Sequence, residues 1–340
     1  MTDFKKVLLS KEYEFLKTNP HLGKNIILLG LGGSHAYGTN IESSDIDIRG
    51  VALNSKEEIL GAKNFEQVVN TSTDTTIYSI KKIVSLLMAC NPNTIEILGL
   101  KPEHYLYLSP IGQELLDNKK LFLSRRAVNS FGGYAFAQLR RLDNKAVRTV
   151  EQAAREQHIL NSINTASEVW KERYPEFKAG GIKLYLDDAI QEDFDKEIFM
   201  DIDLKHYPLR DYKGMWAEMK NIVSDYAKIG HRNQHAIENG KLGKHMMHLV
   251  RLYLMCIDIL EKQEINTYRE NDIPFLMSIR NGAFLDANSQ PTEAFYDMIN
   301  EYEKRMQYAA SNTSLPDKPR VKQIDEFLMS INERVVLGTI

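Results

Sequence analysis

The sequence predicts an α+β protein with an α/β-like core, in which a small mixed-sheet domain over residues 1–115 precedes a mainly helical domain over residues 116–340. Within the first segment, short runs of β-branched or alternating residues are separated by glycine turns and short helical patterns. Beyond it, most of the chain carries helix-forming residues. A chain of 340 residues also exceeds the roughly 250 at which single cores stop growing.

The first domain is expected to contain an N-terminal helix, three strands, a short helix after the first strand, and a further helix after the third. Residues 3–17 carry apolar side chains at helical spacing. Three runs are short and branched or alternate with period two, which predicts strands: "NIILLGL" (25–31), "DIDIRGVAL" (45–53) and "TSTDTTIYSI" (71–80). The following "KKIVSLLMAC" predicts a helix that ends before an Asn-Pro pair.

The second domain is expected to be built mainly from helices. The helical patterns lie within residues 123–161, 213–227, 241–262 and 290–310. Residues 174–212 are less regular, because they contain a Gly-Gly pair and an acidic run. We expect an exposed loop there, with short helical or strand pieces.

Composition argues against a polycationic, a disulfide-rich secreted or a membrane-spanning protein. The net charge is −3, so a nucleic-acid partner would have to use a local basic patch. Cys90 and Cys256 both lie in apolar, helix-like surroundings, which argues against a disulfide framework and for a reducing compartment. The N-terminus lacks the features of a secretory signal, and no run approaches about 18 apolar residues. We therefore expect a cytoplasmic protein without a membrane partner.

The stretch "GGSHAYGTNIESSDIDIRG" (32–50) places two aspartates shortly after a glycine turn. Residues two apart in a strand point to the same face, so Asp45, Asp47 and Arg49 should project together while Ile46 and Ile48 enter the core. Adjacent carboxylates suit hard Mg²⁺, which is commonly held by one or two carboxylates together with substrate phosphates. A two-metal transfer of a phosphoryl or nucleotidyl group requires such a clamp.

The glycine turn could bind phosphate. The backbone N–H groups of Gly33 and Ser34 and the Ser34 hydroxyl are suited to cradle phosphate oxygens, and a helix beginning at His35 would add a positive dipole. Asp74, at the start of the next strand-like run, is the best candidate for a third carboxylate. A carboxylate there could also accept the proton of an attacking hydroxyl. The alternative is a turn beside a solvated strand face, with Asp74 as a turn residue.

These motifs resemble a known superfamily. Gly33-Ser34, Gly38 and Asp45-Ile-Asp47 are similar to the glycine-serine and Asp-x-Asp signature of DNA polymerase β-type nucleotidyltransferases. Four blocks between about residues 30 and 282 resemble the nucleotidyltransferases associated with bacterial RNA-repair pathways: "GSHAYGT…SDIDIRGV", "TIYSIKKIVSLLMACNPNTIEIL", "KHMMHLVRL" and "YRENDIPFLMSIRNG".

The resemblance implies an active site and its ligands. Residues 1–115 would form the nucleotidyltransferase domain, with Asp45, Asp47 and Asp74 as catalytic residues that ligate two Mg²⁺ ions, for which Mn²⁺ could substitute. The substrate would be an NTP such as ATP, held through its triphosphate by Gly33 and Ser34, and Arg49 would either contact phosphate or neutralise the aspartates.

Two further basic segments are candidates for phosphate or acceptor binding. Lys244, His248 and Arg251 share one face of a predicted helix and could receive the β- and γ-phosphates or an acceptor backbone. The segment 125–155, with Arg141 among its basic residues, could follow an RNA backbone. Both could equally be solvated helix faces.

The sequence thus predicts an Mg²⁺-dependent enzyme that moves an NMP from an NTP to a hydroxyl, by resemblance an RNA end, and releases pyrophosphate. Nucleotidylation of a protein is one alternative, and a non-catalytic nucleotide- or RNA-binding module is another. A zinc hydrolase built from His231, His235, His245 and His248 is a third, although the glutamate of the metalloprotease motif is missing. Glu96 is interpreted as a structural cap or pairing residue.

Overall fold

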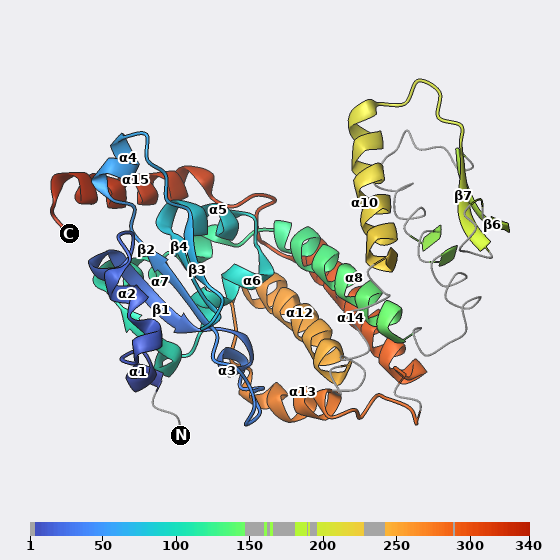
Figure 1. Ribbon diagram of the computed structural model, residues 1–340, viewed down its shortest axis with the longest axis horizontal. Helices are drawn as coiled ribbons and strands as arrows, with labels where there is room; N and C mark the ends of the chain where they lie inside the picture. The colour runs from blue at the N-terminus through green and yellow to red at the C-terminus, as the bar shows by residue number, and fades with distance from the viewer. Residues whose placement is uncertain are drawn as a thin grey trace. The chain divides into compact units, whose positions relative to one another are not determined.

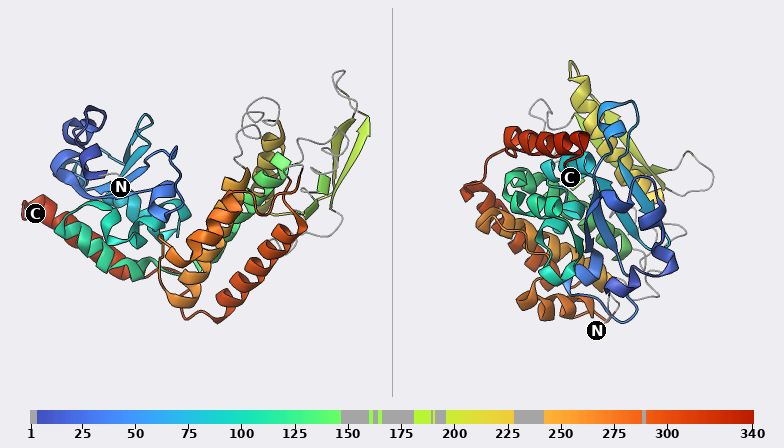
Figure 2. Two further views of the ribbon diagram at one scale, coloured as in Figure 1. Left: turned by 90° about the horizontal axis from the view of Figure 1, so that it is seen from below. Right: turned by 90° about the vertical axis from the view of Figure 1, so that its left-hand side faces the viewer.

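The computed structural model describes residues 4–146, 160–161, 164–165, 181–188, 190, 196–227, 242–287 and 290–340 (Figures 1 and 2). The chain divides into two compact units: unit 1 comprises residues 1–136, 247–283 and 293–340, and unit 2 comprises residues 137–246 and 284–292. These units do not follow the boundary expected at residue 115, because C-terminal helices join the unit that holds the N-terminal sheet. Whether residues 1–115 act as the catalytic domain stays a prediction.

Unit 1 contains a mixed five-stranded sheet in the order β3-β4-β2-β1-β5. β2 and β4 run parallel, and the other neighbouring strands run antiparallel. Every residue of β1 is buried, as expected for a central strand of branched side chains. The arrangement confirms the predicted α+β class. The strands are β1 (Ile26–Leu31), β2 (Ile48–Ala52), β3 (Gln67–Asn70), β4 (Thr75–Ser79) and β5 (Tyr105–Leu108).

Helices pack against this sheet. α5 (Ile80–Met88) contacts β2 and β4 and begins at Ser79, whose side chain accepts a hydrogen bond from the Lys82 N–H. α7 (Pro110–Asp117) contacts β1 and β5, and α15 (Val321–Leu337) contacts α4 and α5 (Figure 1). The other helices of unit 1 are α1 (Phe4–Val7), α2 (Phe15–Thr18), α3 (Gly33–Tyr37), α4 (Lys56–Leu60), α6 (Pro92–Ile95), α13 (Ile273–Arg280) and α14 (Glu293–Asn312).

Unit 2 contains a two-stranded antiparallel sheet and a long helix. β6 (Ile182–Asp188) pairs with β7 (Lys196–Ile202) within the segment expected to be an irregular loop, and α10 (Leu209–Ala227) follows. α8 (Arg126–Ala146) and α12 (Leu242–Lys262) contribute residues to both units. The region after residue 115 is therefore mainly helical in its described part, as predicted.

Three predicted elements differ from the structure. The helix expected over residues 3–17 is divided into α1, a 3₁₀ turn and α2, because Ser10 is extended (φ −70°, ψ 159°). The strand expected from residue 45 begins only at Ile48. The run 71–80 begins with a turn, because the Asn70 side chain accepts hydrogen bonds from the backbone N–H groups of Ser72 and Thr73 and closes the β3–β4 hairpin.

The cysteines and the hydrophobic helices bear on the class of protein. Cys90 and Cys256 are buried free thiols. Within the described ranges, no helix combines the length and the apolar character needed to cross a bilayer.

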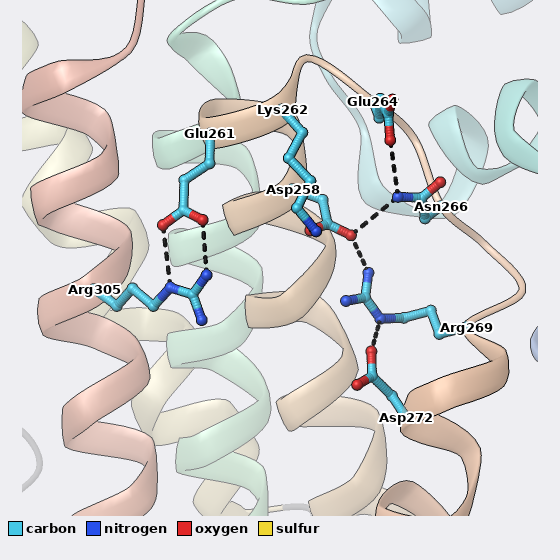
Figure 3. A network of polar contacts seen from close by, with 8 residues as sticks. All are labelled: Asp258, Glu261, Lys262, Glu264, Asn266, Arg269, Asp272 and Arg305. Atoms are coloured by element: carbon cyan, nitrogen blue, oxygen red, sulfur yellow. Dashed lines mark hydrogen bonds and ion pairs between the residues drawn. The ribbon is translucent and has the colours of Figure 1, made fainter.

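An ion-pair network fixes the segment between α12 and α13 (Figure 3). The Asp258 carboxylate, on α12, accepts hydrogen bonds from Arg269 and from Asn266 (3.2 Å) and pairs with Lys262 (2.8 Å). Arg269 also donates to Asp272 (2.6 Å). Burial alone would raise the pKa of Asp258, but these partners hold the pKa below its ordinary value. The network therefore keeps a charged carboxylate inside unit 1 and ties the loop to α12.

Replacing Arg269 should destabilise unit 1 far more than replacing Arg305. The Arg269 and Asp258 side chains are 9% and 4% exposed, so Arg269→Met would leave a buried carboxylate short of a partner and cost about 3 kcal/mol. Arg305 is 52% exposed and pairs with Glu261, and Arg305→Met should cost less than about 1 kcal/mol. Urea denaturation of both variants measures the difference; equal losses would contradict it.

Candidate functional site

Three strand ends meet at one edge of the sheet. β2 and β4 are parallel with Ile48 opposite Thr75, so the residues just before them, Asp47 and Asp74, come side by side. β1 runs antiparallel to β2 and leads into the glycine turn, where the Gly32 N–H donates to the Asp47 carbonyl oxygen (2.8 Å). Sheet register therefore brings the turn and two predicted carboxylates together.

Asp47 and Asp74 form a pair of interacting acids. The Asp47 side chain is 19% exposed and that of Asp74 is 61% exposed. The pKa of Asp47 is raised to about 7, first by burial and then by the hydrogen bond and negative charge of Asp74, against the lowering effect of Arg49. The pair thus concentrates negative charge beside the glycine turn.

Arg49 holds the turn that carries Asp74. Its guanidinium donates to the main-chain oxygens of Asp74 (2.7 Å) and Ile48 (3.0 Å). The same group lies 3.5 Å from a carboxylate oxygen of Asp47 and 3.5 Å from one of Asp74. Arg49 therefore partly neutralises both acids and is held at the site by main-chain contacts. Contact with a nucleotide phosphate stays a prediction for this residue.

The glycine turn requires glycine at residue 33. Gly33 has φ +53°, and a Cβ at this position would collide with the Asp47 carboxylate. α3 begins here, and the first N–H groups of a helix lack intrahelical acceptors. The amides of Gly33 and Ser34 thus lie at a helix start directly beside the acid pair, an arrangement suited to anion binding.

Asp45 occupies a different environment. It precedes β2, is exposed, and makes no hydrogen bond or ion pair with the residues that the structure describes. Its neighbour Ile46 is half-buried, whereas Ile48 is buried as predicted. Among the described residues, no group of three or more His, Cys, Asp or Glu side chains is close enough to hold a metal ion. The structure therefore joins Asp47 to Asp74, and the role of Asp45 stays a prediction.

A buried polar cluster forms around Tyr37, the last residue of α3. The Tyr37 hydroxyl donates to Glu96 Oε2 (2.5 Å), and the Arg251 guanidinium lies 3.4 Å from the centre of the Tyr37 ring. Burial raises the pKa of Glu96, against the lowering effect of the Arg251 charge, and the Glu96 carboxylate in turn raises the pKa of Asp47. Glu96 is thus a pairing residue, as interpreted from sequence, but it also acts electrostatically on the site.

The predicted stripe on α12 is only partly exposed. Lys244 is exposed and His248 is half-buried, whereas Arg251 is 9% exposed and bonds to His248 Nδ1 (2.7 Å). Arg251 Nε is buried and has no hydrogen-bond partner among the described residues. Arg251 therefore supports Tyr37 and α3 from inside unit 1. Phosphate binding by these three residues stays a prediction.

Tyr37 and Glu96 were not predicted as part of the site. The available signal was Glu96 itself, a carboxylate in the otherwise apolar run "IEIL". A buried charge requires a partner, but the sequence does not identify that partner as Tyr37, 59 residues away.

Several predicted residues lie outside the described part of the chain. His231 and His235 of the zinc alternative are among them, as are residues 147–155 of the basic segment. The side chain of Arg141 is likewise not described.

Comparison with known proteins supports the family resemblance that these motifs indicate. Residues 9–173 match the model of the RNA repair pathway DNA polymerase beta family. The match supports the polymerase β-type nucleotidyltransferase family associated with RNA repair for this part of the chain. Neither a curated protein nor a solved structure matches the chain.

Gly33→Ala should lower the stability of the protein by straining the glycine turn. The left-handed backbone and the collision with Asp47 should together cost about 1–3 kcal/mol. Gly133, on α8, is the matched control, because a Cβ there meets no atom of the described residues within 4 Å. Gly133→Ala should stabilise by about 0.5–1 kcal/mol. Thermal denaturation distinguishes the two variants, and a stable Gly33→Ala protein would contradict the described turn.

Asp47→Asn should stabilise the metal-free protein at alkaline pH. The pKa of Asp47 lies near 7 in the native state, against 3.8 ordinarily, so the native state binds more protons than the unfolded state between these values. Ionisation of Asp47 therefore destabilises the native protein as pH rises through this window. At about pH 8 the variant should gain about 2–4 kcal/mol, at roughly 1.4 kcal/mol per pKa unit.

Urea denaturation with EDTA, from about pH 3 to pH 8, tests this expectation. The advantage of Asp47→Asn should vanish below about pH 4, where the carboxyl is protonated in both states. Asp325→Asn, an exposed position on α15, is the control and should show no such pH dependence. A constant difference between wild type and Asp47→Asn across this range would contradict the shifted pKa.

Proposed function

We propose that this protein transfers an NMP from an NTP to the hydroxyl of an RNA end and releases pyrophosphate. The observation that carries the proposal is the Asp47–Asp74 pair, which lies against the glycine turn at the start of α3. The family match supports the reaction class and the connection with RNA repair.

The donor set fits a divalent cation. Two neighbouring carboxylates repel each other, and burial of Asp47 increases the cost of its charge. Arg49 lies 3.5 Å from each acid and compensates only in part. Asp47 and Asp74 would hold Mg²⁺ or Mn²⁺, with Asp45 as a further predicted ligand. When bound, the cation would neutralise negative charge on the triphosphate during transfer.

The glycine turn would hold the triphosphate. The backbone amides of Gly33 and Ser34, with the Ser34 hydroxyl, would donate to phosphate oxygens, and the close approach is possible because Gly33 has no side chain. This placement brings the nucleotide beside the acid pair, so that most of the catalysis is positioning and electrostatic stabilisation.

The acceptor hydroxyl then forms a bond to the α-phosphorus of the NTP, and the bond between that phosphorus and the bridging oxygen to the β-phosphorus breaks. Pyrophosphate leaves with the electron pair of the broken bond. Asp74 is the more exposed of the two acids and would accept the proton of the hydroxyl.

Removal of either paired acid should abolish transfer. With α-³²P-labelled NTPs, Mg²⁺ and RNA that carries a free 3′-hydroxyl, Asp47→Ala and Asp74→Ala should each reduce labelling by about 10²–10³-fold or more. Asp45→Ala measures whether the exposed aspartate contributes. Asp325→Ala, on the exposed face of α15, is the matched control and should retain wild-type activity.

The acceptor is identified in the same assay. Label on RNA supports the proposal, whereas label on protein alone would replace RNA with a protein acceptor. Binding of NTP with no transfer to any acceptor would contradict the enzyme assignment.

A further inference from the structure

The first three turns of α10, in unit 2, carry an exposed stripe of basic and aromatic side chains. At 100° per residue, four basic or aromatic residues fall within about one third of the helix circumference, together with Leu209 and Ala217. We call these four residues the basic-aromatic stripe: Arg210, Lys213, Trp216 and Lys220.

The stripe is exposed and cationic. Trp216 is 48% exposed, the Arg210 side chain is 83% exposed, and both lysines are exposed. Neither Lys213 nor Lys220 forms an ion pair with the residues that the structure describes. Large apolar surface is normally turned inward, as the buried Met215 on the opposite face illustrates. An exposed indole between free cations therefore indicates a binding surface.

The acidic side chains in the same turns of α10 lie outside the basic-aromatic stripe. Asp211 is 16% exposed at its side chain and pairs with Arg210 (3.2 Å), and Glu218 is half-buried. The stripe therefore offers positive charge to an anionic partner without exposed carboxylates beside it.

The indole of Trp216 is held in place by a ring beneath it. Tyr212 is half-buried one turn earlier, and the two rings stack with centroids 6.4 Å apart and an interplanar angle of 16°. A ring held in this way loses little side-chain entropy when a partner binds. Its free area is suited to stacking on a nucleobase, because every base presents a π face.

We propose that the basic-aromatic stripe binds a single-stranded part of the RNA acceptor, with Trp216 stacked on a base and Lys213 and Lys220 in contact with phosphates. This inference rests on the proposed function for the identity of the acceptor. Single-stranded RNA fits better than a membrane surface, because the family match connects this chain with RNA repair. The large exposed apolar side chains beside the cations, Leu209 and Trp216, are also too few to form the continuous apolar face of a membrane-surface helix.

Trp216 also provides the probe for the test. The chain has two tryptophans, Trp170 and Trp216, so a Trp170→Phe background leaves only the stripe indole to fluoresce. Titration with single-stranded RNA in the absence of NTP should quench this fluorescence. Fluorescence anisotropy of labelled RNA then gives the affinity of variants that lack Trp216.

Charge reversal at the two lysines should remove the electrostatic contribution to binding. Lys213→Glu/Lys220→Glu should weaken RNA binding at least tenfold and lower the slope of log affinity against log salt by about 1.4, at roughly 0.7 per phosphate contact. Trp216→Ala should weaken binding about 5- to 100-fold. The control Lys318→Glu/Lys322→Glu reverses two exposed lysines of unit 1 and should leave the affinity within about twofold.

The outcomes separate this inference from the proposed function. If the lysine reversal binds RNA as tightly as wild type, or wild type binds anionic vesicles but not RNA, the stripe has been misassigned whatever the catalytic result. If the stripe variants lose RNA binding while the wild type transfers no nucleotide, the binding surface stands and the proposed reaction fails. Circular dichroism of each variant must match wild type, so that a loss of binding reflects the stripe.

Discussion

The lateral pairing of β2 with β4 is the contact on which the site depends. Because the two strands are parallel and Ile48 lies opposite Thr75, the preceding acids Asp47 and Asp74 share one edge of the sheet. Their mutual repulsion and the burial of Asp47 oppose folding, as the raised pKa of Asp47 indicates. Hydrophobic packing of β1 and α5 stabilises the sheet that holds these charges together. Such local destabilisation is common where a protein binds a ligand or performs chemistry.

The surrounding elements support this contact in different ways. Arg49 fixes the turn of Asp74 through main-chain oxygens, and Gly33 allows the helix start to lie directly against Asp47. Tyr37, at the end of the same short helix, is anchored by Glu96 and covered by Arg251 from α12. A residue over 200 positions later in the chain thus supports the helix that carries the glycine turn, which explains why the compact unit includes C-terminal helices.

Local patterns predicted the strands β1, β2 and β4, the helix α5, and the neighbourhood of the glycine turn and Asp47. They did not predict β3 or β5, because short edge strands carry little periodic signal. The alternating pattern predicted that this strand begins at Asp45, whereas the pairing of β2 with β1 and β4 begins at Ile48. The α12 stripe was read from helical spacing, but burial of Arg251 depends on Tyr37, a tertiary contact that spacing cannot show.

Mn²⁺ binding measured by electron paramagnetic resonance in Asp47→Asn, Asp74→Asn and the double variant tests the central claim most directly. If both carboxylates hold one ion, each single substitution should weaken Mn²⁺ binding nearly as much as the double substitution, because the two acids act as a unit. Wild-type affinity in both single variants would contradict the claim that this pair of acids is the metal-binding part of the site.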